Sequence, residues 1–165
     1  MPRRPLRIIG INPGSKYLAL AIFKGSDLRY WAIKVLEGKW SKEKMEKAKE
    51  VISDLIVRYD LNILAIKRLH PSRTSRNLNR LVAKIKEFSK RKGLRVYDYS
   101  LKNLERFFCP GEKINKGQMA ELIASEYPFL LPVLEKERKN KNSYAIRMFE
   151  AIALGIRCFR QLDKH

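Results

Sequence analysis

The hydrophobic pattern of the amino-terminal stretch predicts three consecutive β-strands. Residues 7–15 read Arg-Ile-Ile-Gly-Ile-Asn-Pro-Gly-Ser, a run of β-branched residues that ends in a Pro-Gly turn and is typical of a buried strand. Apolar residues continue through Tyr17–Lys24 and 28–36, with a Gly-Ser-Asp turn between them. Strands joined by such short turns are expected to form an antiparallel meander.

Periodic apolar positions then predict two helices that alternate with two further strands. Ser41 can cap a helix that runs to about residue 59, because apolar residues recur there every three or four positions. The continuous apolar run at 61–66 is expected to form a strand buried on both faces. A second helix at 75–92 is followed by a fifth strand at 94–99.

The rest of the chain is predicted to be mostly helical. Helices are expected at 101–108 and 116–127, and residues 135–142 are interpreted as a charged linker. The last helix, at about 144–159, is apolar nearly all round and is therefore expected to be buried. This order predicts a single α/β domain over residues 1–165, with a five-stranded mixed sheet and helices on both faces. That is the layout of the ribonuclease H-like fold.

Composition narrows the function classes. The chain has 165 residues and no apolar run long enough to cross a membrane, so we expect a cytoplasmic protein. Its two Cys and two His show no metal-ligand spacing, and no cofactor is expected. Abundant Lys and Ile with few Gln suggest a thermophilic source.

Charge is the strongest compositional signal. The chain has 36 Lys and Arg against 17 Asp and Glu, a net charge of +19, which favours a nucleic-acid partner. Residues 67–95 contain eleven Lys or Arg and one acid, so this stretch is interpreted as a surface that faces phosphates. The candidate nucleic-acid-binding residues are Lys67, Arg68, Arg73, Arg76, Arg80, Lys84 and Arg147.

Two charges interrupt the apolar last helix. Arg147 and Glu150 lie three residues apart and share one face of it. Buried charges must be paired or must face a cleft. The two residues are therefore expected either to pair with each other or to belong to a functional site.

Four motifs carry a family resemblance. Residues 8–15 resemble the opening motif of RuvC-type Holliday-junction resolvases, Ile-Leu-Gly-Ile-Asp-Pro-Gly-Ser. Leu-Ala-Ile-Lys-Arg at 64–68 is similar to their fourth-strand motif, in which Glu follows Ala-Ile. Residues 99–106 and Lys-Gly-Gln-Met at 116–119 are similar to the segments that precede the last part of that fold, and 149–156 is similar to the last-helix motif. The motifs occur in the family's order along nearly the whole chain.

The resemblance implies a degenerate catalytic site. Members of the family cut junction DNA with two Mg²⁺ ions held by four carboxylates, and the matching positions here are Asn12, Lys67, Arg147 and Glu150. Lys and Arg do not ligate Mg²⁺, and their charges repel it. The usual two-metal reaction is therefore expected to be lost, and no metal is expected.

Three functions remain open. The first is a non-catalytic protein that binds the backbone of structured RNA or branched DNA. In it Lys67 and Arg147 would hold a phosphate, Asn12 would add a hydrogen bond and Glu150 would orient Arg147. The competing interpretation is that these charges merely neutralise one another.

The second function is a metal-dependent nuclease with a rebuilt site, in which Glu150 acts with Asp98 or Glu121. The third is a ribosome-associated homodimeric scaffold or assembly factor that binds ribosomal RNA. A dimer is implied by the resemblance, since RuvC-type resolvases are homodimers.

Overall fold

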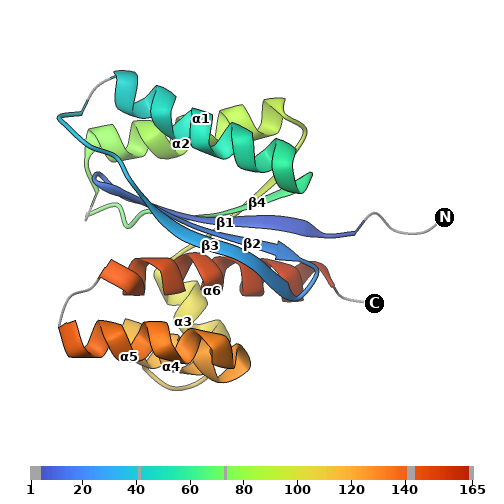
Figure 1. Cartoon of the computed structure of the whole chain (residues 1–165), viewed down its shortest axis with the longest axis vertical. Helices are drawn as coiled ribbons and strands as arrows, with labels where there is room; N and C mark the ends of the chain where they lie inside the picture. Colours follow the sequence, from blue (N-terminus) through green and yellow to red (C-terminus); the bar gives the residue numbers. More distant parts are fainter. Residues whose placement is uncertain (1–4, 41, 73, 141–143, 164–165) are drawn as a thin grey trace.

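Residues 5–40, 42–72, 74–140 and 144–163 are described by a computed structural model of the chain (Figure 1). They form a five-stranded sheet with the strand order β3-β2-β1-β4-β5. The strands are β1 (Arg7–Pro13), β2 (Tyr17–Lys24), β3 (Asp27–Val35), β4 (Ile63–Lys67) and β5 (Arg95–Tyr99). β2 is antiparallel to both β1 and β3, whereas β4 is parallel to both β1 and β5. The predicted fold class is confirmed.

Helices cover both faces of the sheet (Figure 1). α1 (Lys42–Tyr59) and α2 (Arg76–Arg91) pack on one face, and α6 (Tyr144–Leu162) packs on the other. Beyond α6 lie α3 (Leu101–Phe108), α4 (Lys116–Glu126), the 3-10 helix η1 (Pro128–Leu130) and α5 (Leu131–Asn140). The sheet therefore separates two apolar cores, one against α1 and α2 and one against α6.

Helix α6 is the central helix that the sequence predicts. Phe149, Ile152 and Leu154 are fully buried in it, as expected for a helix that is apolar nearly all round. It lies between the sheet and the layer of α4 and α5 (Figure 1). Within the described ranges, none of the helices combines the length and the apolar character that a membrane span requires.

Two glycines let α6 lie directly on the sheet. A Cβ atom at Gly10 of β1 would stand 2.2 Å from the backbone oxygen of Ala151, and one at Gly155 would stand 2.2 Å from the ring of Phe23. Both positions therefore require glycine for a close approach of backbone to its neighbour. This contact brings the first turns of α6 against the carboxyl end of β1.

The interpretation of residues 135–142 as a charged linker is wrong for the described part of that range. Leu131–Asn140 is the helix α5, in which Leu134 and Glu137 are buried. The Glu137 carboxylate accepts a hydrogen bond from the backbone N–H of Ala145 at 2.9 Å, in the first turn of α6. The charged segment is therefore a helix, and one of its carboxylates satisfies a backbone N–H at the start of the next helix. The proposed capping residue Ser41 lies outside the described residues.

Candidate functional site

The carboxyl ends of two neighbouring strands carry polar residues under α6. Ile11 and Ile66 are paired across β1 and β4, and Asn12 and Lys67 directly follow them. Glu150 lies in the second turn of α6, with its side chain only 2% exposed. The sheet topology thus brings together three of the four positions at which the resemblance expects metal ligands.

Glu150 is the centre of a cluster of donors. Its Oε2 atom accepts hydrogen bonds from Lys67 Nζ at 2.7 Å and from Asn12 Nδ2 at 3.0 Å. Its Oε1 atom lies 2.8 Å from Lys116 Nζ. We call Asn12, Lys67, Lys116 and Glu150 the Glu150 cluster. Two cations and one carboxylate leave this cluster with a formal charge of +1.

The amide of Asn12 fits this cluster better than a carboxylate would. Its Nδ2 atom donates to Glu150 and also to the backbone oxygen of Arg147, at 3.1 Å. An ionised Asp has no donor for either contact and would add a second negative charge beside Glu150. Asn12 therefore fastens the end of β1 to α6.

Lys116 is the member of the cluster to which sequence reasoning assigned no role. Lys116 is the first residue of α4. Asn115 and Gln118 cap the amino terminus of this helix with a reciprocal capping box. The helix dipole disfavours a cation at this end of a helix. A lysine there is a weak signal that its charge has a partner elsewhere in the fold, and that partner is Glu150.

Arg147 does not pair with Glu150. Its guanidinium lies over the ring of Tyr17, 5.3 Å from the centroid, and Arg147 is exposed. No ion pair or side-chain hydrogen bond joins Arg147 to Glu150, both of which the structure describes. The expectation that Glu150 orients Arg147 is therefore wrong. Arg147 and Glu150 do lie three residues apart on α6, but the Glu150 carboxylate is held by Lys67 of β4 and Lys116 of α4.

A buried lysine supports the turn after β1. Lys44 of α1 donates from Nζ to the backbone oxygens of Ser15, at 2.7 Å, and Gly38, at 3.1 Å. Its burial needs such acceptors, since an unpaired buried ammonium group is costly. These bonds tie the turn next to Asn12 to the start of α1.

The Glu150 cluster does not fit the two Mg²⁺ ions that the resemblance implies. Magnesium takes oxygen ligands in octahedral geometry, and here two ammonium groups already lie against the Glu150 carboxylate. Among the residues that the structure describes, no group of three or more His, Cys, Asp and Glu is placed to hold a metal ion. The chemistry of these donors is that of an internal ion pair.

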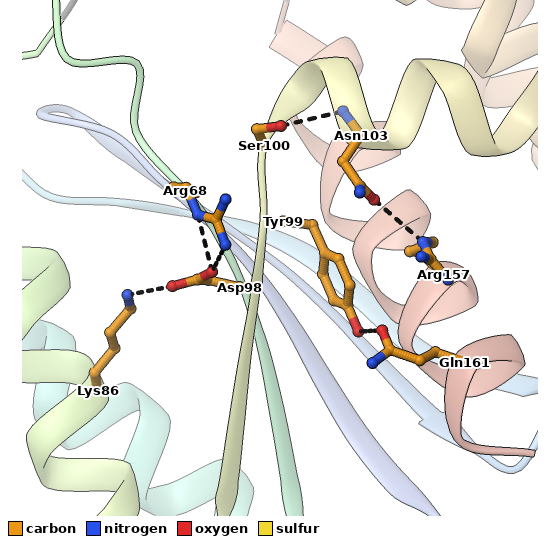
Figure 2. Close-up of polar contacts among 8 residues, drawn as sticks. All are labelled: Arg68, Lys86, Asp98, Tyr99, Ser100, Asn103, Arg157 and Gln161. Carbon is orange, nitrogen blue, oxygen red and sulfur yellow. Dashed lines mark hydrogen bonds and ion pairs between the residues drawn. The ribbon is translucent and has the colours of Figure 1, made fainter.

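Asp98 belongs to a different group, on the α2 side of the sheet. It accepts hydrogen bonds from Lys86 at 2.7 Å and from Arg68 Nε at 3.0 Å, and Arg68 Nη2 lies 2.5 Å away (Figure 2). Burial acts to raise the pKa of Asp98, but the hydrogen bonds and charges of Lys86 and Arg68 outweigh it and lower that pKa. Figure 2 shows Tyr99, the next residue of β5, turned toward Gln161 of α6 instead.

The rebuilt-nuclease interpretation names two acids that bind other partners. Asp98 is held by Arg68 and Lys86, and Glu121 pairs with Arg138 of α5. Among the described residues, neither carboxylate forms a hydrogen bond or an ion pair with a member of the Glu150 cluster, in which Glu150 contacts Lys67, Lys116 and Asn12. Glu150 therefore stands as the one carboxylate of its cluster.

The other predicted nucleic-acid-binding residues are spread over several places. Lys67 is 19% exposed within the Glu150 cluster, whereas Arg68 is mostly exposed and held by Asp98. The remaining described members on α2 are exposed, and they are Arg76, Arg80 and Lys84. Arg73 lies outside the described residues. The basic stretch is thus a surface rather than a single pocket.

Several solved structures of resolvases share this architecture. RuvC of Thermus thermophilus in complex with a Holliday junction substrate is 14% identical, with a TM-score of 0.70 and 94% of each chain covered. A second RuvC structure from Thermus thermophilus is 15% identical, with a TM-score of 0.63, covering 73% of this chain and 79% of that one. Fowlpox virus resolvase with its substrate Holliday junction DNA is 17% identical, with a TM-score of 0.60, covering 96% of this chain and 100% of that one.

The likeness to resolvases is visible in the comparison of structures but not in the comparisons of sequence. No protein-family model and no curated protein matches this sequence. At 14–17% identity the structural likeness establishes the architecture. The chain has a RuvC-like ribonuclease H fold, as its motifs predict.

Proposed function

We propose that this protein binds nucleic acid on its RuvC-like fold without cleaving it. The observation that carries the proposal is the Glu150 cluster, in which lysines lie against the carboxylate at the carboxyl ends of β1 and β4. A two-metal cleavage reaction needs hard cations held by several carboxylates. Lysine ammonium groups supply positive charge at this place but provide no metal-bound water for attack on phosphorus.

The cations of this region are proposed to hold a phosphate of the backbone. Lys67 uses one of its three donors on Glu150, and Lys116 remains 47% exposed. Arg147 lies next to this cluster, because its backbone oxygen accepts a hydrogen bond from Asn12. Its exposed guanidinium lies over the Tyr17 ring. Contacts between these cations and a phosphate need no bridging metal ion, so binding should not require divalent metal.

Branched DNA and structured RNA are the proposed targets. Two of the similar structures contain Holliday junction DNA, which favours branched DNA as the first target to measure. The net charge of +19 favours phosphate contacts, which provide affinity without reading sequence. We therefore expect recognition by shape and backbone.

The test measures binding and cleavage together. A fluorescent four-way DNA junction, the matching linear duplex and an RNA hairpin are titrated with protein in EDTA and in Mg²⁺, with fluorescence anisotropy as the readout. We expect binding in EDTA that Mg²⁺ does not strengthen, and intact strands on denaturing gels after incubation with Mg²⁺ or Mn²⁺. Metal-dependent cleavage that Glu150→Gln abolishes would overturn the proposal in favour of a rebuilt nuclease.

An RNA-rich particle is the second proposed target. The charge of +19 on 165 residues favours a ribosome-associated role, and a homodimer would present two equivalent basic faces for bridging. Sedimentation of cell extract on a sucrose gradient tests the first point, and analytical ultracentrifugation of purified protein tests the second. Protein that stays at the top of the gradient would exclude the ribosomal role.

A further inference from the structure

Helix α2 carries a row of cations along its solvent face. Arg76, Arg80 and Lys84 stand at successive intervals of four residues, so they lie on one side of the helix. Four residues advance a helix by about 6 Å. The three charges are thus spaced like consecutive phosphates along one strand of a nucleic acid.

The orientation of this row is fixed by packing. The opposite side of α2 buries Leu81, Val82 and Ile85 in the core between α2 and the sheet. The helix cannot turn about its axis without exposing these residues. All three cations of the row are exposed, which keeps them available to a partner in solvent.

The row is not neutralised from within the protein. Neither Arg76 nor Arg80 forms an ion pair with any residue in the described ranges, and Lys84 lies 4.0 Å from Glu87 in an exposed and therefore weak pair. Glu87, which also pairs with Arg91, marks the end of the row.

The neighbouring helix α1 shows the contrast. It covers the same face of the sheet, but its charges are mixed in sign. Lys49 pairs there with Glu46, and Arg58 pairs with Asp54. The excess of unneutralised positive charge is therefore a property of α2, not of every exposed helix on this face.

We propose that the Arg76–Arg80–Lys84 row binds consecutive phosphates of one nucleic-acid strand. This inference rests on the proposed function and assigns it a surface outside the Glu150 cluster. α2 begins at the side of the molecule where β4 ends in Lys67, so a strand that follows α2 leads toward that cluster (Figure 1). The ligand is a phosphodiester backbone, recognised by its charge spacing and not by its bases.

The test is the salt dependence of binding. Each phosphate contact on a duplex contributes about 0.9 to the slope of log K against log salt concentration. The triple variant Arg76→Gln/Arg80→Gln/Lys84→Gln should therefore bind a short fluorescent DNA duplex with a slope shallower by roughly 2.7. Both slopes are measured by anisotropy in EDTA over a range of NaCl concentrations.

A second triple variant controls for net charge. Lys102→Gln/Lys136→Gln/Lys139→Gln removes three exposed cations from α3 and α5, on the other side of the sheet. It lowers the net charge equally, and its slope is expected to change by less than about 1 if those cations touch no phosphate. Thermal unfolding followed by circular dichroism confirms that both variants are folded.

The outcomes separate the two proposals. A large change in slope for the α2 variant alone supports the row. Equal changes in the two variants would overturn it and would leave general attraction of a basic protein for DNA as the explanation. If the unaltered protein binds neither DNA nor RNA, the proposed function itself is wrong.

Discussion

Glu150 and Asp98 are two carboxylates on opposite sides of one sheet, and each is held by two cations. The Glu150 side chain is 2% exposed and lies beneath α6, whereas the Asp98 side chain is 26% exposed and faces α2. Glu150 also accepts a hydrogen bond from Asn12. The two groups have similar chemistry in different surroundings.

The difference in burial decides what each group contributes. An exposed ion pair gains little, because water solvates both partners nearly as well when they are apart. A buried pair is costly to assemble and far more costly to break, because removal of one partner leaves an unpaired charge in the interior. The Glu150 cluster is therefore expected to be essential to the fold at this edge of the sheet, and the Asp98 group is not.

Glu150→Gln should have the largest effect on stability. The substitution leaves Lys67, which is mostly buried, without its counter-ion, and we expect a loss of about 3 kcal/mol in the free energy of unfolding. Urea denaturation followed by tryptophan fluorescence measures it. The double variant Glu150→Met/Lys67→Met should recover much of the loss, since it removes both charges. A loss below about 1 kcal/mol in the single variant would contradict a buried, tightly coupled cluster.

Asn12→Asp should have an intermediate effect. It removes the donor to Glu150 Oε2 and to the backbone oxygen of Arg147, and it adds a negative charge to a site that is 7% exposed. We expect a loss of about 2 kcal/mol at neutral pH, from the lost donors and the repulsion. Addition of Mg²⁺ should not restore the melting temperature, because Lys67 and Lys116 remain in place. Restoration of the melting temperature by Mg²⁺ would instead show that the added carboxylate creates a metal site beside Glu150.

Asp98→Asn should have the smallest effect, and one that depends on pH. The pKa of Asp98 is lower in the folded state than in the unfolded chain, so its contribution is present above the unfolded pKa and is lost as pH falls through the folded pKa. At pH 7 the variant should be less stable by about 1 kcal/mol or less. The difference from the unaltered protein should shrink as the pH falls below about 4, the ordinary pKa of an Asp side chain. A difference that stays constant over this range in urea denaturation would contradict the assigned cause.

Local pattern was sufficient to predict most of the fold. The β-branched run that contains Ile8, Ile9 and Ile11 forms the buried strand β1, and the helical spacing of Leu81, Val82 and Ile85 forms the buried side of α2. These signals are short-range, because side-chain direction follows the period of the element itself. The helix after residue 134 was not predicted from local pattern, because its charged sequence does not show that packing buries Leu134 and Glu137.

The sequence by itself determined the sheet and the buried last helix. It also placed Asn12 and Lys67 near the carboxyl ends of two strands and Glu150 in the early turns of the last helix. Only the tertiary structure decided which cations hold Glu150. The spacing along α6 predicted Arg147 as the partner of Glu150. In the structure Lys67 of β4 and Lys116 of α4 contact the carboxylate, and Arg147 lies over Tyr17. The physical reason is that a buried charge is neutralised by whatever donors packing brings within hydrogen-bond distance. The position of those donors depends on how distant segments dock, as when Gly10 and Gly155 allow α6 to rest against the sheet.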